Sequence, residues 1–155
     1  MSETDGAPAS ALVIDLLRAL DEAGILYCHW KSNEAIASSL VAENDLDLLI
    51  ARGDASAFNA VVHDLGFRVA RPSTARHVPG MVDYFGYDDM WERMVHVQAH
   101  YQLVLGDDMT KNFRLPVEQA YLEAREFDGP IAVANPDFEL LLFVVRMVLK
   151  HCPWD

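Results

Sequence analysis

The feature that most constrains the fold is an alternation, over roughly the first 70 residues, between segments of helical periodicity and short apolar runs. Apolar residues recur at three- and four-residue steps after Ser10 and again after Asp54, which predicts two amphipathic helices. The runs at 25–30 and 45–50 have the length and apolar character of buried strands. Helices that alternate with strands in this way indicate an α/β protein.

The second half of the chain predicts a hairpin and a final helix. Strand-like segments at 81–87 and 93–104 are separated by a short polar connection. An edge strand is expected at 131–134, and Asn135 followed by proline favours a helix start. That helix is apolar almost all round over 140–149, so we expect it to be buried on most sides or to pack against another layer.

Length and composition indicate one domain. We expect residues 1–10 to be disordered and residues 11–155 to form a single domain, whose apolar last helix predicts either further chain beyond Asp155 or an oligomer interface. The net charge of -12 disfavours nonspecific binding to nucleic acid. Cys28 and Cys152 lack metal or disulfide spacing, and no apolar run has the length of a membrane span, so a cytoplasmic location is expected.

The most informative polar residues are Asp45 and Asp47. Two residues apart in a strand, they present both carboxylates on the same face. Adjacent carboxylates repel, and a divalent cation such as Mg²⁺ removes that cost while it leaves coordination positions for phosphate oxygens. An isolated pair of this kind more often sits at a solvated strand end.

A candidate phosphate-binding turn precedes this pair. Lys31 and Ser32 follow the strand at 25–30 and open a short helix, whose backbone N–H groups and positive end can hold phosphate. Lys31 is one of only three lysines in the chain. Lys111, beyond the turn at Gly106, is a second residue that could reach a triphosphate, although solvation explains it equally well.

These motifs, in this order, resemble the nucleotidyltransferase superfamily. The closest resemblance is to bacterial nucleotidyltransferase-like domains that occur alone or fused to thymidylate-kinase-like domains, in polysaccharide-associated gene neighbourhoods. It extends over roughly residues 20 to 150. The segments that carry it are YCHWKSN at 27–33, DLDLL at 45–49, LGFR at 65–68 and MVHVQAHY at 94–101.

The resemblance implies a mixed β-sheet flanked by helices, with Asp45 and Asp47 as ligands of Mg²⁺ or Mn²⁺. It also places Lys31, Ser32 and Asn33 near the nucleotide phosphates. The implied reaction is the attack of an acceptor on the α-phosphate of an NTP, with release of pyrophosphate.

Two positions depart from the family pattern. Lys31 stands where many relatives have glycine, so a bulkier residue occupies the turn. Catalytic relatives place a third carboxylate on a neighbouring strand, and here the corresponding strand offers His96, Gln98 and His100 on one face. Glutamine cannot act as a base. Either histidine could take a proton or bind a metal, but a histidine on a strand is more often a hydrogen-bonded structural residue.

Two functions from different classes therefore remain open. The first is a nucleotidyltransferase that moves a nucleoside monophosphate from a Mg-NTP to an unidentified acceptor. The second is a noncatalytic binding or regulatory domain that acts with a partner protein or a kinase-like domain. A glycosyltransferase that uses the D-x-D pair is a weaker alternative, because only one helix and one strand precede the motif. A nucleophilic hydrolase is weaker still, because the sequence has no nucleophile elbow.

Overall fold

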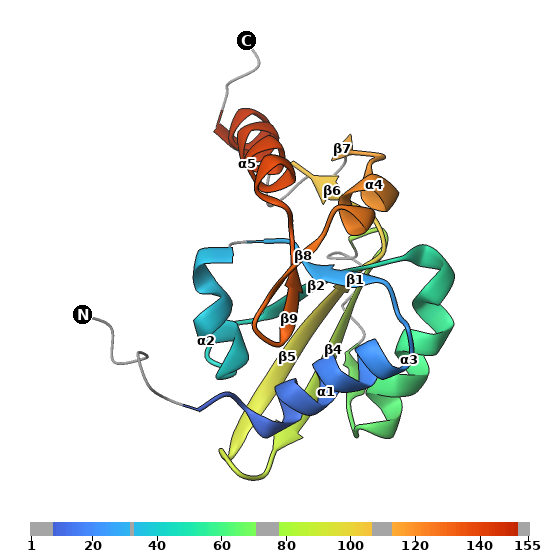
Figure 1. The fold of residues 1–155 in the computed structure, drawn as a ribbon, viewed down its shortest axis with the longest axis vertical. Coiled ribbons are helices and arrows are strands. Elements are labelled where there is room, and N and C mark those ends of the chain that lie inside the picture. Colours follow the sequence, from blue (N-terminus) through green and yellow to red (C-terminus); the bar gives the residue numbers. More distant parts are fainter. Residues whose placement is uncertain (1–7, 32, 71–77, 107–112, 152–155) are drawn as a thin grey trace, which may run out of the picture.

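A computed structural model describes residues 8–31, 33–70, 78–106 and 113–151 of the chain (Figure 1). The α-helices are α1 (Ala11–Glu22), α2 (Ile36–Leu40), α3 (Ala55–Asp64), α4 (Glu118–Glu123) and α5 (Pro136–His151), with short 3-10 helices η1 (Asn33–Ala35) and η2 (Arg52–Asp54). The main sheet contains β1 (Tyr27–His29), β2 (Leu46–Ile50), β3 (Arg68–Ala70), β4 (Met81–Asp88), β5 (Arg93–His100), β8 (Glu126–Asp128) and β9 (Ile131–Val133). A separate two-stranded sheet pairs β6 (Val104–Leu105) with β7 (Phe113–Arg114).

The main sheet is mixed, with strand order β3-β4-β5-β2-β1-β9-β8. β2 runs parallel to β5, and β1 runs parallel to β9, while the other neighbours are antiparallel. The α/β class with a mixed, helix-flanked sheet is thus confirmed. The prediction of an edge strand at 131–134 was wrong, because β9 lies between β1 and β8 and the short β8 forms the edge.

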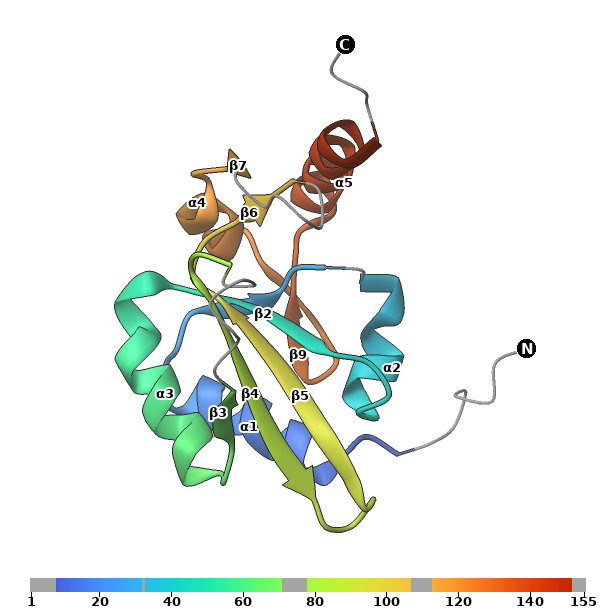
Figure 2. The ribbon, with the colours of Figure 1, turned by 180° about the vertical axis from the view of Figure 1, so that it is seen from behind.

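The two faces of the sheet differ in chemistry. Along β5 the side chains of Val95, Val97 and Ala99 are buried, and they alternate with polar side chains on the opposite face. Helices α1 and α3 pack together, and α1 also contacts β4. Figure 2 shows the sheet from behind, with β4 and β5 in front of α1. One face is therefore apolar and covered by helices, and the polar residues of β5 lie on the other.

Helix α1 begins where the sequence predicted. The hydroxyl of Ser10 accepts a hydrogen bond from the backbone N–H of Val13, which satisfies one of the free donors at the helix start. Its buried residues, at positions 13, 16, 17 and 20, follow the expected three- and four-residue steps. Of the segment expected to be disordered, residues 1–7 lie outside the described residues, whereas Ser10 is buried.

At Gly86 on β4, side chains from α1 and from the segment after α3 pack directly against the backbone. A Cβ atom at this position would stand 2.8 Å from the ring of Phe67 and 2.9 Å from the side chain of Leu12. We expect Gly86→Ala to lower the free energy of unfolding by about 1–2 kcal/mol, because a packed ring and a helix must both shift. Urea denaturation measures this loss, and Gly53→Ala is the matched control, since its added Cβ meets nothing within 4 Å. Equal effects of the two substitutions would contradict the close packing.

Helix α5 stands apart from the sheet, beside α4 and the small sheet (Figures 1 and 2). Asn135 caps it, because its side-chain oxygen accepts from the backbone N–H of Asp137, as the sequence predicted. Among the side chains of this helix that the structure describes, Leu142 alone is fully buried, and Phe138, Val145 and Leu149 are partly buried against the core. Of the two alternatives expected for this helix, burial on most sides does not hold within this chain, since the opposite side of α5 is exposed and apolar, and packing against another layer stays a prediction.

Candidate functional site

The fold brings the predicted site residues of two distant segments onto one face of neighbouring strands. β2 and β5 are parallel, and their register sets Asp47 beside Gln98. Gln98 therefore occupies the place on the adjacent strand where the third carboxylate was sought. Because side chains alternate along β5, His96 and His100 share the face of Gln98.

Lys31 lies at the centre of one half of this cluster. Its Nζ donates to Asp47 Oδ1 at 2.6 Å and to Gln98 Oε1 at 3.4 Å, and it lies 3.3 Å from His100 Nε2. His100 Nε2 also lies 3.2 Å from the same Asp47 oxygen. The ammonium group further stands 5.0 Å from the centre of the Trp30 ring. The lysine expected to contact nucleotide phosphate thus contacts a carboxylate of this chain.

The surroundings of Asp47 stabilise its ionised form. Burial by itself would raise the pKa of this carboxyl group, but the hydrogen bond with His100 and the charge and hydrogen bond of Lys31 outweigh that effect. The pKa of Asp47 is lowered to about 2 as a result. The side chains of Lys31 and Asp47 are only 17% and 15% exposed, so solvent screens this ion pair weakly.

Asp45 belongs to the other half of the cluster, around His96. The Nδ1 atom of His96 lies 2.7 Å from Asp45 Oδ1, and its Nε2 atom lies 2.9 Å from Asp83 Oδ1. The imidazole is stacked on Phe85, with ring centres 4.3 Å apart. One imidazole therefore bridges two carboxylates. When both ring nitrogens carry a proton, Nδ1 donates to Asp45 and Nε2 donates to Asp83.

Asp83 is the functional candidate that sequence reasoning missed. Its side chain, on β4, is only 19% exposed and contacts His96. The antiparallel register sets Asp83 opposite Gln98. The signal that could have found it is the alternation of β4, which puts Asp83 on the face of Phe85, opposite buried Tyr84.

Of the remaining predicted residues, the structure describes Asn33, which contacts a histidine other than those of this cluster. Asn33 lies in η1, and its Oδ1 is 3.3 Å from Nδ1 of the buried His29. Burial lowers the pKa of His29, although the contact with Asn33 acts in the opposite direction. Ser32 and Lys111 lie outside the described residues, so their predicted roles stay predictions.

The donor set of the described residues does not fit the divalent cation implied by the family resemblance. Among these residues, no group of three or more histidine, cysteine, aspartate or glutamate side chains is arranged to hold a metal ion. Asp47 contacts an ammonium group, and Asp45 contacts an imidazole nitrogen. Gln98 lies on β5, between β2, which carries both aspartates, and β4, and it offers a neutral amide in place of a carboxylate.

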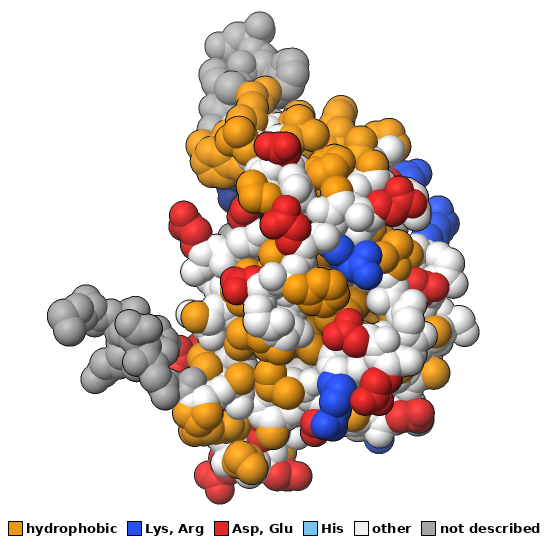
Figure 3. All heavy atoms as spheres, in the orientation of Figure 1, with side chains coloured by type: hydrophobic (Ala, Val, Ile, Leu, Met, Phe, Trp, Pro, Cys, Tyr) orange, Lys and Arg blue, Asp and Glu red, His pale blue; other side chains and the backbone are white. Residues whose placement is uncertain are grey.

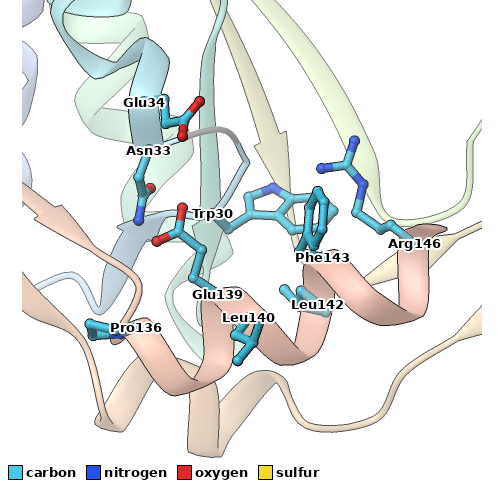
Figure 4. A pocket seen from close by; sticks show the side chains of 9 residues that line it. All are labelled: Trp30, Asn33, Glu34, Pro136, Glu139, Leu140, Leu142, Phe143 and Arg146. Carbon is cyan, nitrogen blue, oxygen red and sulfur yellow. The ribbon is translucent and has the colours of Figure 1, made fainter.

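A cavity of about 520 Å³ lies beside the cluster, between α5 and the segment that follows β1 (Figure 4). Trp30 connects the two places, because it lines this cavity and also meets the His100 ring edge to face, with 4.9 Å between centres. The volume is in the range of small-molecule pockets. The lining residues are Trp30, Asn33, Glu34, Pro136, Glu139, Leu140, Leu142, Phe143 and Arg146.

Comparison of the chain with models of protein families, with curated proteins and with solved structures found no match. The fold and the polar cluster define a mixed α/β domain with a charged site on the polar face of its sheet. Within the described ranges, no helix combines the length and apolar character needed to cross a bilayer. The nucleotidyltransferase resemblance therefore rests on the sequence motifs alone.

Proposed function

We propose that the chain is a nucleotidyltransferase-like domain that binds a ligand or partner without transferring a nucleotide. One observation carries this proposal: the Lys31 ammonium lies 2.6 Å from Asp47, one of the two carboxylates that would hold a metal in a catalytic relative. The neighbouring Gln98 is neutral. The cluster thus pairs two carboxylates with internal partners of the chain, whereas metal-dependent nucleotidyl transfer needs carboxylates that are available to cations.

Electrostatics opposes a divalent cation at this position. A Mg²⁺ ion bound to Asp47 while Lys31 stayed in place would stand about 4 Å from the ammonium group, where the two charges repel by roughly 8 kcal/mol at an effective dielectric constant near 20. Expelling Lys31 instead removes an ion pair that is mostly shielded from water. Either route makes metal binding costly, so Lys31 competes with Mg²⁺ for the same oxygen.

A binding role is supported by the cavity beside α5. Its walls include the aromatic side chains of Trp30 and Phe143, together with a few charged side chains such as Glu139 and Arg146 (Figure 4). Apolar walls with few polar groups are typical of sites that recognise a small molecule or a segment of a partner. A kinase-like or other partner protein is the class that the family resemblance suggests.

Calorimetry tests this proposal. We expect no heat of Mg²⁺-dependent binding when each NTP is added to the wild-type chain, because Lys31 holds the Asp47 carboxylate. The double variant Lys31→Met with Gln98→Asp removes the internal cation and supplies a third carboxylate, so it is expected to gain binding of Mn²⁺. Arg18→Met, which changes an exposed ion pair on α1, is the matched control. Mg²⁺-dependent NTP binding by the wild type would overturn the proposal.

Nucleotidyl transfer is the second candidate function, and Asp83 is the observation that favours it. Asp83 lies on β4, the strand next to β5, and is a third carboxylate near the pair. The His96 ring contacts both Asp83 and Asp45 and so links the two side chains. In that function Asp45 and Asp47 would be the metal ligands and His96 would hold a proton between carboxylates. Pyrophosphate release from an NTP that is lost in Asp45→Ala and Asp47→Ala, with folding unchanged, would establish this candidate.

A further inference from the structure

The exposed side of α5 is a continuous apolar surface. Six of its side chains are between 42% and 63% exposed, and we call this set the outer face: Leu140, Leu141, Phe143, Val144, Met147 and Val148. The space-filling view shows hydrophobic side chains gathered around this end of the molecule (Figure 3). An apolar patch on a projecting helix is typical of a surface that another protein covers.

Charged residues border the outer face in an ordered way. Glu139, Arg146 and Lys150 are separated by seven and four residues, so they lie along one side of α5, next to Phe143. The acidic residue lies near the start of the helix and the two basic residues near its end. Among the described residues, neither Glu139 nor Arg146 takes part in an ion pair.

We propose that the outer face pairs with the outer face of a second copy of this chain, with the two α5 helices antiparallel. When the two-fold axis passes between Phe143 and Val144, Leu140 lies opposite Met147 of the second copy. Glu139 then lies between Arg146 and Lys150 of the second copy, and the two-fold axis repeats the contact. A parallel pair would instead set this charged edge against the opposite, uncharged edge of the second helix, so only the antiparallel arrangement brings the opposite charges together.

The area agrees with a specific dimer. With about half of each side chain exposed, the outer face offers on the order of 500 Å² per copy. Two copies then bury about 1,000 Å², which is the lower bound for a specific interface. The inner side of α5, through Leu142, keeps its contact with the core of its own chain.

Charge reversal tests the pairing by its effect on mass in solution. Glu139 and Arg146 also line the cavity, but the mass of the protein is measured without any ligand, so this readout is separate from the binding proposed above. Sedimentation of the wild type is expected to show a dimer. Glu139→Lys and the double variant Arg146→Glu with Lys150→Glu each set like charges together, so each is expected to weaken dimerisation at least about tenfold. A mixture of the two variants is expected to form a dimer again, because all the charges are then complementary. A monomeric wild type, or an unchanged dissociation constant for Glu139→Lys, would overturn the proposal.

Disulfide crosslinking tests the antiparallel register separately. In a Cys152→Ser background, where the remaining Cys28 is buried, an equimolar mixture of Leu140→Cys and Met147→Cys is expected to crosslink under oxidation. Leu140→Cys alone is expected to stay uncrosslinked, because two copies of position 140 lie at opposite ends of the pair. Crosslinking of Leu140→Cys with itself would show a parallel pair and would refute the arrangement.

Discussion

Lys31→Met is expected to lower the free energy of unfolding by about 2–3 kcal/mol at pH 7. The substitution keeps most of the side-chain volume but leaves the Asp47 carboxylate, which is 15% exposed, without its ammonium partner. The loss is smaller than for a fully buried pair, because water reaches part of both side chains. Chemical denaturation measures it, and Arg18→Met, which breaks an exposed ion pair with Asp15, is the control with an expected loss below about 0.5 kcal/mol.

The same substitution has a defined pH dependence. The folded protein lowers the pKa of Asp47 to about 2 from an ordinary value of 3.8, so the ionised group stabilises the fold above pH 4. That contribution is lost as the pH falls from about 4 to about 2, where Asp47 takes up a proton in the folded state as well. The difference between wild type and Lys31→Met is therefore expected to shrink across this range. A difference that stays constant down to pH 2 would contradict the assignment of Lys31 as the partner of Asp47.

Asp88→Ala is expected to lower the free energy of unfolding by about 3 kcal/mol. The Asp88 carboxylate is buried and accepts from the Ser10 hydroxyl and the Leu12 backbone N–H, at the start of α1. It also accepts from the backbone N–H groups of Met90 and Trp91 in the hairpin. Alanine leaves these donors without an acceptor in a place from which water is excluded.

Two further variants separate the charge of Asp88 from its shape. Asp88→Asn keeps one acceptor oxygen and is expected to lose less stability than the alanine variant. Asp89→Ala changes the exposed neighbour and is expected to have little effect, so it is the matched control. Thermal denaturation followed by circular dichroism compares all three. A loss for Asp89→Ala as large as that for Asp88→Ala would mean that turn conformation, and not the buried carboxylate, holds this corner.

Local signals predicted the helices and strands closely. Ser10 and Asn135 were both expected to start helices, and both accept the capping hydrogen bonds that define such starts. The hairpin of β4 and β5 was expected from two apolar segments around a polar connection. These predictions were correct because helix caps, turns and hydrophobic periodicity depend on residues that are only a few positions apart.

The candidate site was predicted in part. The alternation of side chains along β5 predicted that His96 and His100 share one face, and the spacing of Asp45 and Asp47 predicted that both carboxylates leave one face of β2. In the structure His96 contacts Asp45 and His100 contacts Asp47. The partner of each carboxylate was not predicted, because Lys31 was assigned to a phosphate. That assignment treated a turn as a ligand site. The antiparallel pairing of β1 with β2, continued by the hydrogen bond from the Trp30 N–H to the Asp47 carbonyl, brings the following Lys31 onto the Asp47 carboxylate.

What the sequence determined by itself is the set of local elements, the α/β class and the polar face of β5, since each follows from patterns within one segment. Only the tertiary structure decided the strand order, which makes β9 an inner strand, and the pairing of Lys31 with Asp47. It also decided that Asp83 meets His96 and that α5 exposes an apolar side. These are contacts between residues far apart in the chain, and their energies depend on which surfaces the packed sheet leaves open.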